Sequence, residues 1–401
     1  MLSVCLYFHM HQPYRVRRYR MFDIGTNHNY FDTDEETDLN NARVLRKVAQ
    51  KSYRPAGEVF SALLRTHPEF KFAISITGTL VEQLEKHDPY TLKLYQDMVN
   101  TGRVEIVGET YYHSLASLYS MPEFVRQVRM HRDMIQRVFG VVPRVFRNTE
   151  LVYTNHVAEW AERAGYKGIL AEGWDGVLQG RSPAFLYQPS NTTSIKALLK
   201  HYKLSDDVAF RFGDSSWSGY PVTADKFANW IHAHHGNGNT VNLFMDYETF
   251  GEHQWADKGI FDFMRHLPRA IMAHPDTVFM TPSETADAYP TVDSFDVPHV
   301  LTWADTERDL SAWVGNDIQK SAIEDTYALE QDVLRTYDAG IIEDWRKLQT
   351  SDHFYYMCTK YFNDGDVHAY FNPYENPYEA YIAHRNALED LKHRIERYTV
   401  R

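Results

Sequence analysis

The sequence has few cysteines, no long apolar run and a deficit of positive charge, and each shortage excludes a class of protein. Only Cys5 and Cys358 occur among 401 residues, so we expect neither a disulfide framework nor a CxxC metal site. No window approaches the roughly 20 apolar residues that a membrane-spanning helix needs. The formal net charge of −12 disfavours nucleic acid and anionic membranes as partners, because their phosphates would be repelled.

The N-terminus also lacks the pattern of a secretory signal. The apolar run 2–8 is short, has no basic segment before it and leads directly into HMHQP at 9–13. We therefore expect a soluble protein of the cytoplasm. The sequence gives no indication of the oligomeric state.

What the chain does have is aromatic residues, with 27 Tyr, 22 Phe and 8 Trp making up 14% of the sequence. Most of the Phe fill a core that an apolar content of 43% makes large. Tyr and Trp beside polar clusters point to another use. Flat rings stack on the faces of sugars, and the Tyr hydroxyl forms hydrogen bonds, so the composition favours a carbohydrate ligand.

Short apolar segments alternate with helical periodicity along the first 300 residues, which predicts an α/β fold with parallel strands. About seven strands separated by helices are typical of an α/β barrel. The strands are expected at 2–8, 71–77, 103–107, 143–147, 167–171, 195–201, 241–245 and 277–280, and the helices at 41–66, 79–99, 122–138, 154–164 and 223–234. From residue 301 to 401 only helical spacing remains, so we expect a catalytic barrel over 1–300 and a C-terminal helical bundle over 301–401 that completes the substrate cleft.

Acidic residues and histidines follow the ends of several predicted strands. In a parallel barrel these ends converge on one face, where active sites are built. The pattern therefore favours an enzyme. The residues concerned are His9, His11, Glu109, His113, Glu150, Glu172 and Asp246.

The stretch NLFMDYETFGEH at 242–253 carries this pattern most clearly. A buried apolar strand breaks without a spacer into Asp246, Glu248, Glu252 and His253, and Gly251 lets the chain turn away. Burial at the strand end is expected to raise the pKa of Asp246 towards that of a general acid. Two carboxylates from different strands, Glu150 and Asp246, suit acetal hydrolysis, in which one stabilises or attacks the anomeric carbon and the other protonates the leaving oxygen.

Five segments resemble, in order, the signature regions of glycoside hydrolase family 57. They are HQP at 11–13, GETYYHS at 108–114, FRNTELVY at 146–153, MDYETFGEH at 245–253 and SDHFYYM at 351–357. The match is best to the α-amylase-like branch, which the segments at 210–221 and 302–313 also resemble.

This resemblance implies a (β/α)7 barrel, an incomplete form of the TIM barrel, with a C-terminal helical domain. It further implies a retaining α-glycosidase that acts on α-1,4-glucans through a glycosyl-enzyme intermediate without a metal or other cofactor. By motif, Glu150 is the nucleophile and Asp246 is the acid/base, and Glu248, Glu252 and His253 support Asp246. The residues expected to line the sugar subsites are His11, Glu109, His113, Trp217, Asp352 and His353. Because both catalytic positions hold carboxylates, we expect an active enzyme.

Three alternatives remain open at this point. A 4-α-glucanotransferase would use the same intermediate with a sugar acceptor. A metal-dependent hydrolase of the amidohydrolase type would use His9 and His11 as a metal pair and Asp246 as base, but it needs two further strand-end histidines and only His201 is available. A carbohydrate-binding relative would keep the cleft without catalysis.

Overall fold

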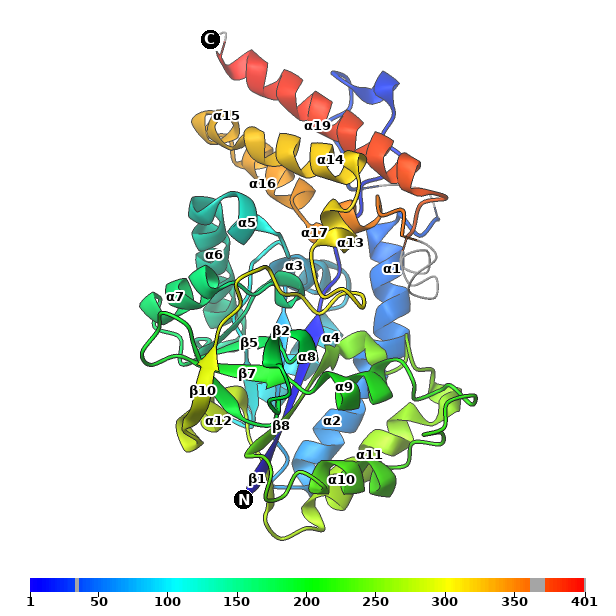
Figure 1. The fold of residues 1–401 in the computed structure, drawn as a ribbon. Coiled ribbons are helices and arrows are strands. Elements are labelled where there is room, and N and C mark those ends of the chain that lie inside the picture. The colour runs from blue at the N-terminus through cyan, green and yellow to red at the C-terminus, as the bar shows by residue number, and fades with distance from the viewer. Residues whose placement is uncertain (33–35, 361–371, 400–401) are drawn as a thin grey trace.

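The computed structural model describes residues 1–32, 36–360 and 372–399 and contains an incomplete parallel barrel beneath a layer of helices (Figure 1). One sheet has the order β3-β2-β1-β8, and a second has the order β4-β5-β7-β6-β10. The barrel strands are β1 (Leu2–Met10), β2 (Phe72–Ile76), β3 (Val104–Ile106), β4 (Val145–Arg147), β5 (Gly168–Glu172), β7 (Lys196–Lys200) and β8 (Thr240–Asp246).

Two narrow seams join these sheets into a ring. At one seam, Gly108 just after β3 donates to Val145 and accepts from Arg147, both at 2.8 Å. A side chain at Gly108 would crowd this approach, since a Cβ there would lie 3.1 Å from the hydroxyl oxygen of Tyr166. At the other seam, the His201 N–H donates to the Asn242 carbonyl at 2.8 Å. The expected α/β barrel of seven strands is confirmed, and its incompleteness lies at these seams.

All the predicted strands are present, and two short strands were missed. The apolar segment at 277–280 forms β9 (Thr277–Phe279), which pairs with the start of β1 outside the ring. The missed strands are β6 (Leu186–Pro189) and β10 (Thr291–Phe295) at the edge of the second sheet. The middle of β10 is exposed, so no apolar alternation marks it in the sequence.

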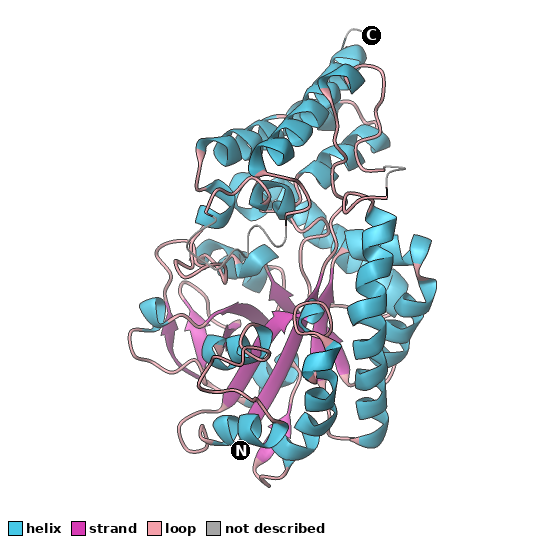
Figure 2. Ribbon diagram, turned by 90° about the vertical axis from the view of Figure 1, so that its right-hand side faces the viewer, coloured by secondary structure: helices cyan, strands magenta, loops and turns pink. Residues whose placement is uncertain are grey.

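Helices cover the outside of the barrel, and Figure 2 shows the strands enclosed by them. The predicted helix at 79–99 is split because Pro89 has no backbone N–H, and the side chain of Asp88 caps the second half. The predicted end of a helix at Gly140 is confirmed by its left-handed φ of 72°. The helices are α1 (Asn41–Val48), α2 (Arg54–Thr66), α3 (Gly78–His87), α4 (Pro89–Val99), α5 (Ala116–Tyr119), α6 (Met121–Phe139), α7 (Asn155–Arg163), α8 (Asp175–Leu178), α9 (Tyr202–Ala209), α10 (Ala224–His232), α11 (Ile260–Met272) and α12 (Pro282–Ala288), with a π-helical turn, η2 (Ala49–Tyr53), between α1 and α2.

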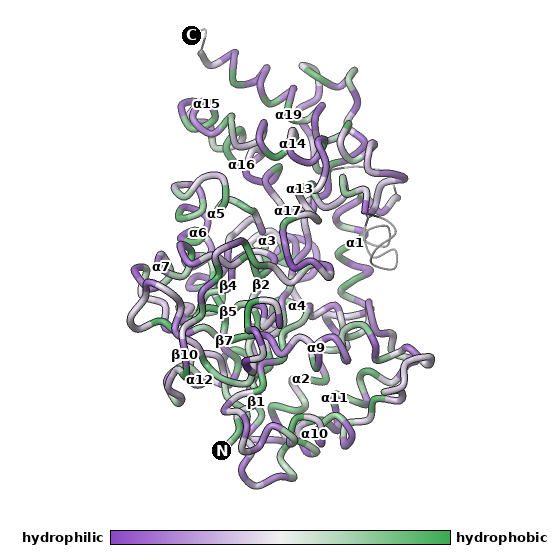
Figure 3. The backbone as a smooth tube through the Cα atoms, viewed as in Figure 1, coloured by the Kyte–Doolittle hydropathy of each residue, from purple (hydrophilic) through white to green (hydrophobic). Residues whose placement is uncertain are grey.

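A second layer of helices lies over the end of the barrel opposite the N-terminus (Figure 1). In Figure 3, hydrophobic and hydrophilic residues are interspersed along α19. None of the helices in the described ranges is both long enough and apolar enough to cross a membrane. The helices of this layer are α13 (Ser311–Val314), α14 (Asp317–Ala328), α15 (Glu330–Arg335), α16 (Ala339–Leu348), α17 (Ser351–Tyr355) and α19 (Pro377–Thr399).

An early segment of the chain, residues 16–32, packs into this second layer. Its apolar residues share one core with Trp313, Trp345 and Leu388. The fully buried carboxylate of Asp390 on α19 fixes the segment by accepting hydrogen bonds from the Gly25 N–H at 2.6 Å, the Tyr30 hydroxyl at 2.6 Å and His28 at 2.8 Å. The helical layer is therefore built from both ends of the chain.

Replacing Asp390 with Asn should lower the free energy of unfolding by about 3 kcal/mol, because the buried donors lose a charged acceptor. Burial alone would raise the pKa of Asp390, but the hydrogen bonds from Tyr30 and Gly25 outweigh it and hold the pKa below its usual value. The stabilisation by the Asp390 carboxylate is present above the unfolded pKa of about 3.9 and is lost as the pH falls through the folded pKa. The stability difference between the parent and Asp390→Asn should therefore shrink in acid. Urea unfolding at pH 7 and pH 3 tests this, with the exposed Asp257→Asn as the control. Equal stability of parent and Asp390→Asn at pH 7 would contradict it.

Candidate active site

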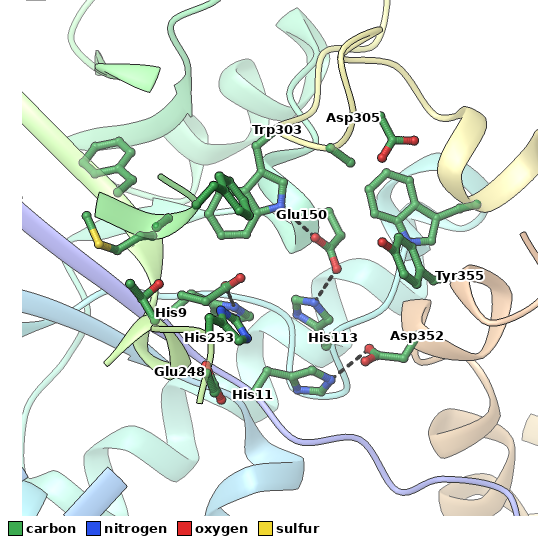
Figure 4. A pocket seen from close by; sticks show the side chains of 18 of the residues that line it. His9, His11, His113, Glu150, Glu248, His253, Trp303, Asp305, Asp352 and Tyr355 are labelled. Carbon is green, nitrogen blue, oxygen red and sulfur yellow. Dashed lines mark hydrogen bonds and ion pairs between the residues drawn. The ribbon is translucent and has the colours of Figure 1, made fainter. Parts of the chain in front are cut away.

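A cavity of about 610 Å³ lies between the carboxyl ends of the barrel strands and the second helical layer. Figure 4 shows its side chains converging from several parts of the chain. His9 comes from β1, Asp246 from β8 and Asp352 from α17, and Trp303 comes from the segment that links the barrel to the helices. Acids, imidazoles and aromatic rings therefore share one enclosed space.

Glu150 stands directly after β4 on a short 3-10 turn, Thr149–Leu151. His113 Nε2 lies 2.9 Å from Glu150 Oε1, and the indole N–H of Trp303 donates to Oε2 at 2.8 Å, so both oxygens are hydrogen-bonded. Burial alone would raise the pKa of Glu150, but the hydrogen bond from His113 and the charges of His113 and Arg147 hold it below its usual value. The site therefore contains an ionised carboxylate that lines the cavity.

The backbone at this turn has a conformation that L-residues rarely adopt. Glu150 and Leu151 have φ values of 56° and 50°, in the left-handed region. The Asn148 side chain fixes the turn by accepting from the Thr149 N–H at 3.0 Å and donating to the Val152 carbonyl at 2.9 Å. The strained turn directs the carboxylate of Glu150 towards His113.

Three imidazole rings form a stack beside the carboxylates. The ring centroid of His113 lies 4.8 Å from that of His9 and 4.1 Å from that of His11. Burial opposes a charge on His113, but the Glu109 carboxylate, 3.6 Å from its Nδ1, and the hydrogen bond to Glu150 raise its pKa to about 9. Burial and the neighbouring His113 lower the pKa of His11 to about 4, although His11 lies 3.0 Å from the Asp352 carboxylate. The charged His113 ring thus stacks on the neutral His11 ring.

Asp246 at the end of β8 differs from the sequence-based expectation. Its side chain is 40% exposed within the cavity, and its Oδ1 lies 3.4 Å from His9 Nδ1. Burial raises its pKa, as expected, but the close contact with His9 and the charge of His253 outweigh burial, so the pKa is lowered. The prediction of a raised pKa was wrong because it left out the His9 contact.

The carboxyl group with the raised pKa is instead Glu248, two residues further on. Burial, followed by the charge of Asp246, raises the pKa of Glu248 to about 7, and the Tyr53 hydroxyl donates a hydrogen bond to it.

The expected turn at Gly251 is confirmed, with a φ of 111° and no room for a side chain, because a Cβ would lie 2.0 Å from the Lys51 carbonyl oxygen.

Five of the expected site residues line this cavity and three do not. Those that line it are His11, His113, Glu150, Asp246 and Asp352. Glu109 is fully buried behind the imidazole stack, 3.2 Å from His9 Nε2. His353 lies on the helical turn after Asp352, where successive side chains diverge, and its Nε2 lies 3.1 Å from the Lys347 carbonyl oxygen. Trp217 packs against Trp230, with ring centroids 6.0 Å apart.

The cavity also contains residues that the sequence did not single out. Trp303 and Arg308 come from a segment without periodicity, and Lys200 is the last residue of β7. The signal for Lys200 was its strand-end position, and the signal for Trp303 was its place in one of the family-like segments. Arg308 lies in the same family-like segment, 302–313, but nothing in the sequence singles it out within that segment.

Some of the site residues could hold a divalent ion. Ligand atoms of His9, Glu109 and His113 lie within 4.8 Å of one another, as do those of His11, His113 and Asp352. These atoms already pair with one another or with Glu150, so an ion would compete with those contacts. His201, the strand-end histidine considered for a metal-dependent hydrolase, does not line the described cavity, and its Nδ1 accepts a hydrogen bond from the Leu204 N–H at 3.4 Å.

Replacing Glu248 with Gln should stabilise the protein more at pH 8 than at pH 5. A carboxyl group whose folded pKa is raised favours folding below that pKa, and this contribution is lost as the pH rises from about 4.5 to about 7. Gln keeps the shape without the charge, and the relative gain at pH 8 should be on the order of 1–3 kcal/mol. Denaturant unfolding at both pH values measures it, and Glu58→Gln on the exposed face of α2 is the control. An equal effect of Glu248→Gln at both pH values would refute the assignment.

Solved structures share this fold. A branching enzyme from Pyrococcus horikoshii superimposes with a TM-score of 0.67 and 14% identity, covering 92% of this chain and 87% of that one. A 4-alpha-glucanotransferase from Thermococcus litoralis gives a TM-score of 0.64 with 17% identity, covering 88% of this chain and 56% of that one.

Sequence comparison agrees with the fold. A Methanocaldococcus jannaschii protein named "Putative alpha-amylase" is 40% identical over 402 residues, covering 97% of this chain and 84% of that protein. An "Alpha-amylase" of Pyrococcus abyssi is 24% identical over 217 residues, covering 53% of this chain and 32% of that protein. The family described as Glycosyl hydrolase family 57 matches residues 5–298. The chain therefore belongs to glycosyl hydrolase family 57.

Proposed function

We propose that this protein is a retaining α-glycosidase that hydrolyses α-1,4-glucans, with Glu150 as nucleophile and Asp246 as acid/base. The observation that carries the proposal is the ionised Glu150 carboxylate, held by His113 and Trp303 in the cavity that Asp246 also lines. The name of the Methanocaldococcus jannaschii relative supports the same substrate class.

In the first step, a Glu150 oxygen forms a bond to the anomeric carbon while the bond from that carbon to the leaving oxygen breaks. The leaving oxygen takes a proton from Asp246. In the second step, the Asp246 carboxylate accepts a proton from water, whose oxygen displaces Glu150. The carboxylate of Glu150 then returns to its hydrogen bonds with His113 and Trp303.

The lowered pKa of Asp246 suits the second step, and substrate binding would prepare Asp246 for the first. Its side chain is 40% exposed. A bound sugar would displace the water around it, and this desolvation would raise its pKa. Binding and protonation of the general acid are therefore coupled in this mechanism.

Two alternative enzyme activities can be distinguished from this proposal by their products or by their response to a chelator. A 4-α-glucanotransferase, the activity named for a relative from Thermococcus kodakarensis, would convert maltoheptaose into products longer than the substrate. Hydrolysis should give only shorter ones. A metal-dependent hydrolase would lose its activity with chelator and regain it with Zn²⁺, whereas the proposed mechanism should be insensitive to chelator.

We also propose that the enzyme acts in the cytoplasm.

Replacing Glu150 with Gln should lower kcat on maltoheptaose by at least about 10³-fold, because an amide cannot form the glycosyl ester. Binding should survive, because Gln keeps the shape of the side chain. Initial rates and calorimetric binding to the same oligosaccharide test this, with thermal unfolding as a check of the fold. A parent-like rate would rule out Glu150 as the nucleophile.

Replacing Asp246 with Asn should have an effect that depends on the leaving group. A sugar leaving group needs a proton, whereas an acidic phenol does not, so hydrolysis of maltoheptaose should fall much further than formation of the glycosyl-enzyme from a nitrophenyl maltooligosaccharide. Burst kinetics with the nitrophenyl substrate measure this difference. Equal losses on both substrates would exclude Asp246 as the general acid.

A further inference from the structure

We propose that Trp303 is a positioning residue for the Glu150 carboxylate, and that Arg308 acts through Trp303 by anchoring the loop 302–308. This inference rests on the proposed function, in which Glu150 is the nucleophile. It adds two residues that the five family-like motifs do not contain.

Backbone pairing brings Trp303 to Glu150 across more than 150 positions of the chain. The Tyr153 N–H donates to the Leu301 carbonyl at 2.8 Å, and the Leu301 N–H donates back at 3.1 Å. The Trp303 N–H then donates to the carbonyl of Glu150 at 3.3 Å, and its indole N–H donates to Oε2 of the same residue at 2.8 Å. One residue therefore holds both the backbone and the side chain of Glu150.

Arg308 closes the loop that carries Trp303. Its guanidinium donates to the Trp303 carbonyl, and its own carbonyl accepts from the Thr302 N–H at 2.9 Å. Asp305 and Arg308 have φ values of 53° and 55°, so the loop bends through two left-handed residues and needs an external anchor.

That anchor is a buried ion cluster at the ends of β5 and β7. Arg308 lies 3.9 Å from the Glu172 carboxylate and 3.6 Å from that of Asp206 on α9. Lys200 lies 3.4 Å from Glu172 and 3.1 Å from Asp206. The charges of the two cations and the two carboxylates balance. Displacement of Arg308 would therefore leave a buried carboxylate without a compensating cation. The loop is thereby fixed to the barrel.

The position of Trp303 matters because a carboxylate that accepts fewer hydrogen bonds binds its proton more tightly. The charged or titratable groups that face Glu150 are His113, Arg147 and Asp352. Arg147 also lies 4.9 Å from the ring centroid of Trp303, so Phe is the chosen replacement because it keeps an aromatic ring beside Arg147. Loss of the indole donor should therefore raise the pKa of Glu150 and lower the fraction of enzyme that has a ready nucleophile.

The test measures the pH dependence of kcat and kcat/KM for Trp303→Phe and Arg308→Met on a nitrophenyl maltooligosaccharide. Trp303→Phe should lower kcat by roughly 10- to 100-fold and move the acid limb to higher pH, with little change in KM. Arg308→Met should produce the same changes to a smaller extent, and Arg308→Lys should recover part of the loss. The double variant should be no worse than Trp303→Phe alone, because Arg308 acts through Trp303.

The control is Arg181→Met, which removes a comparable arginine far from the cavity. Arg181 pairs with Asp293 at 3.0 Å and donates to the carbonyls of Leu178 and Ser294. The Arg181→Met variant should be less stable than the parent, and the acid limb of its pH–rate profile should be unchanged. An Arg308→Met enzyme with parent kcat and acid limb would overturn the role of Arg308, and losses that multiply in the double variant would do the same.

A measurement without turnover separates this inference from the proposed function. In protein labelled with ¹⁵N-Trp, the indole signal of Trp303 is identified by its loss in Trp303→Phe. This signal should shift as Glu150 titrates. Glu150→Gln should remove the shift, and Arg308→Met should reduce it. A Trp303 signal that does not respond to Glu150→Gln would overturn the contact. If the contact holds but α-glucans are not cleaved, only the proposed function fails.

Discussion

Every charged side chain in the centre of this barrel must be compensated by another, and the active site depends on this constraint. Arg147 is fully buried, 3.9 Å from the Glu109 carboxylate and 4.9 Å from the ring centroid of Trp303. Glu109 contacts His9 and His113, which in turn contact the two carboxylates that face the cavity. Removing one partner of such a buried pair typically costs 3–5 kcal/mol, so these residues define the site as a group.

The same constraint explains why distant parts of the chain meet at the cavity. The barrel supplies His9, Glu150 and Asp246, but it leaves one oxygen of Glu150 and one nitrogen of His11 without partners. Trp303 and Asp352, from segments after residue 300, complete these contacts. The helical layer is in turn held to the early segment 16–32 through Asp390. The cleft is therefore a product of tertiary contacts between the two layers.

The sequence predicted the features that depend on local pattern. Strands such as β1 and β8 are buried on both faces and read as apolar runs, and Glu150 and Asp246 could be found because they follow such runs. It did not predict β10, whose middle is exposed, or the direction of the Asp246 pKa shift, which depends on a contact with His9 across two strands. The segment 302–313 was noted for its family likeness, but the contacts of Arg308 within it were not predicted, because its partners come from β5 and α9 and sequence periodicity does not indicate such contacts.

The central claim is that Glu150 forms a covalent bond to the sugar, and the most direct test is to trap that intermediate. A fluorinated α-maltosyl fluoride slows the breakdown of a glycosyl-enzyme more than its formation, so the adduct can be located by mass spectrometry of peptides. The account predicts one maltosyl unit per chain, attached to Glu150 and released by a sugar acceptor or slowly by water. An adduct on another carboxylate, or turnover that inverts the anomeric configuration without any adduct, would contradict it.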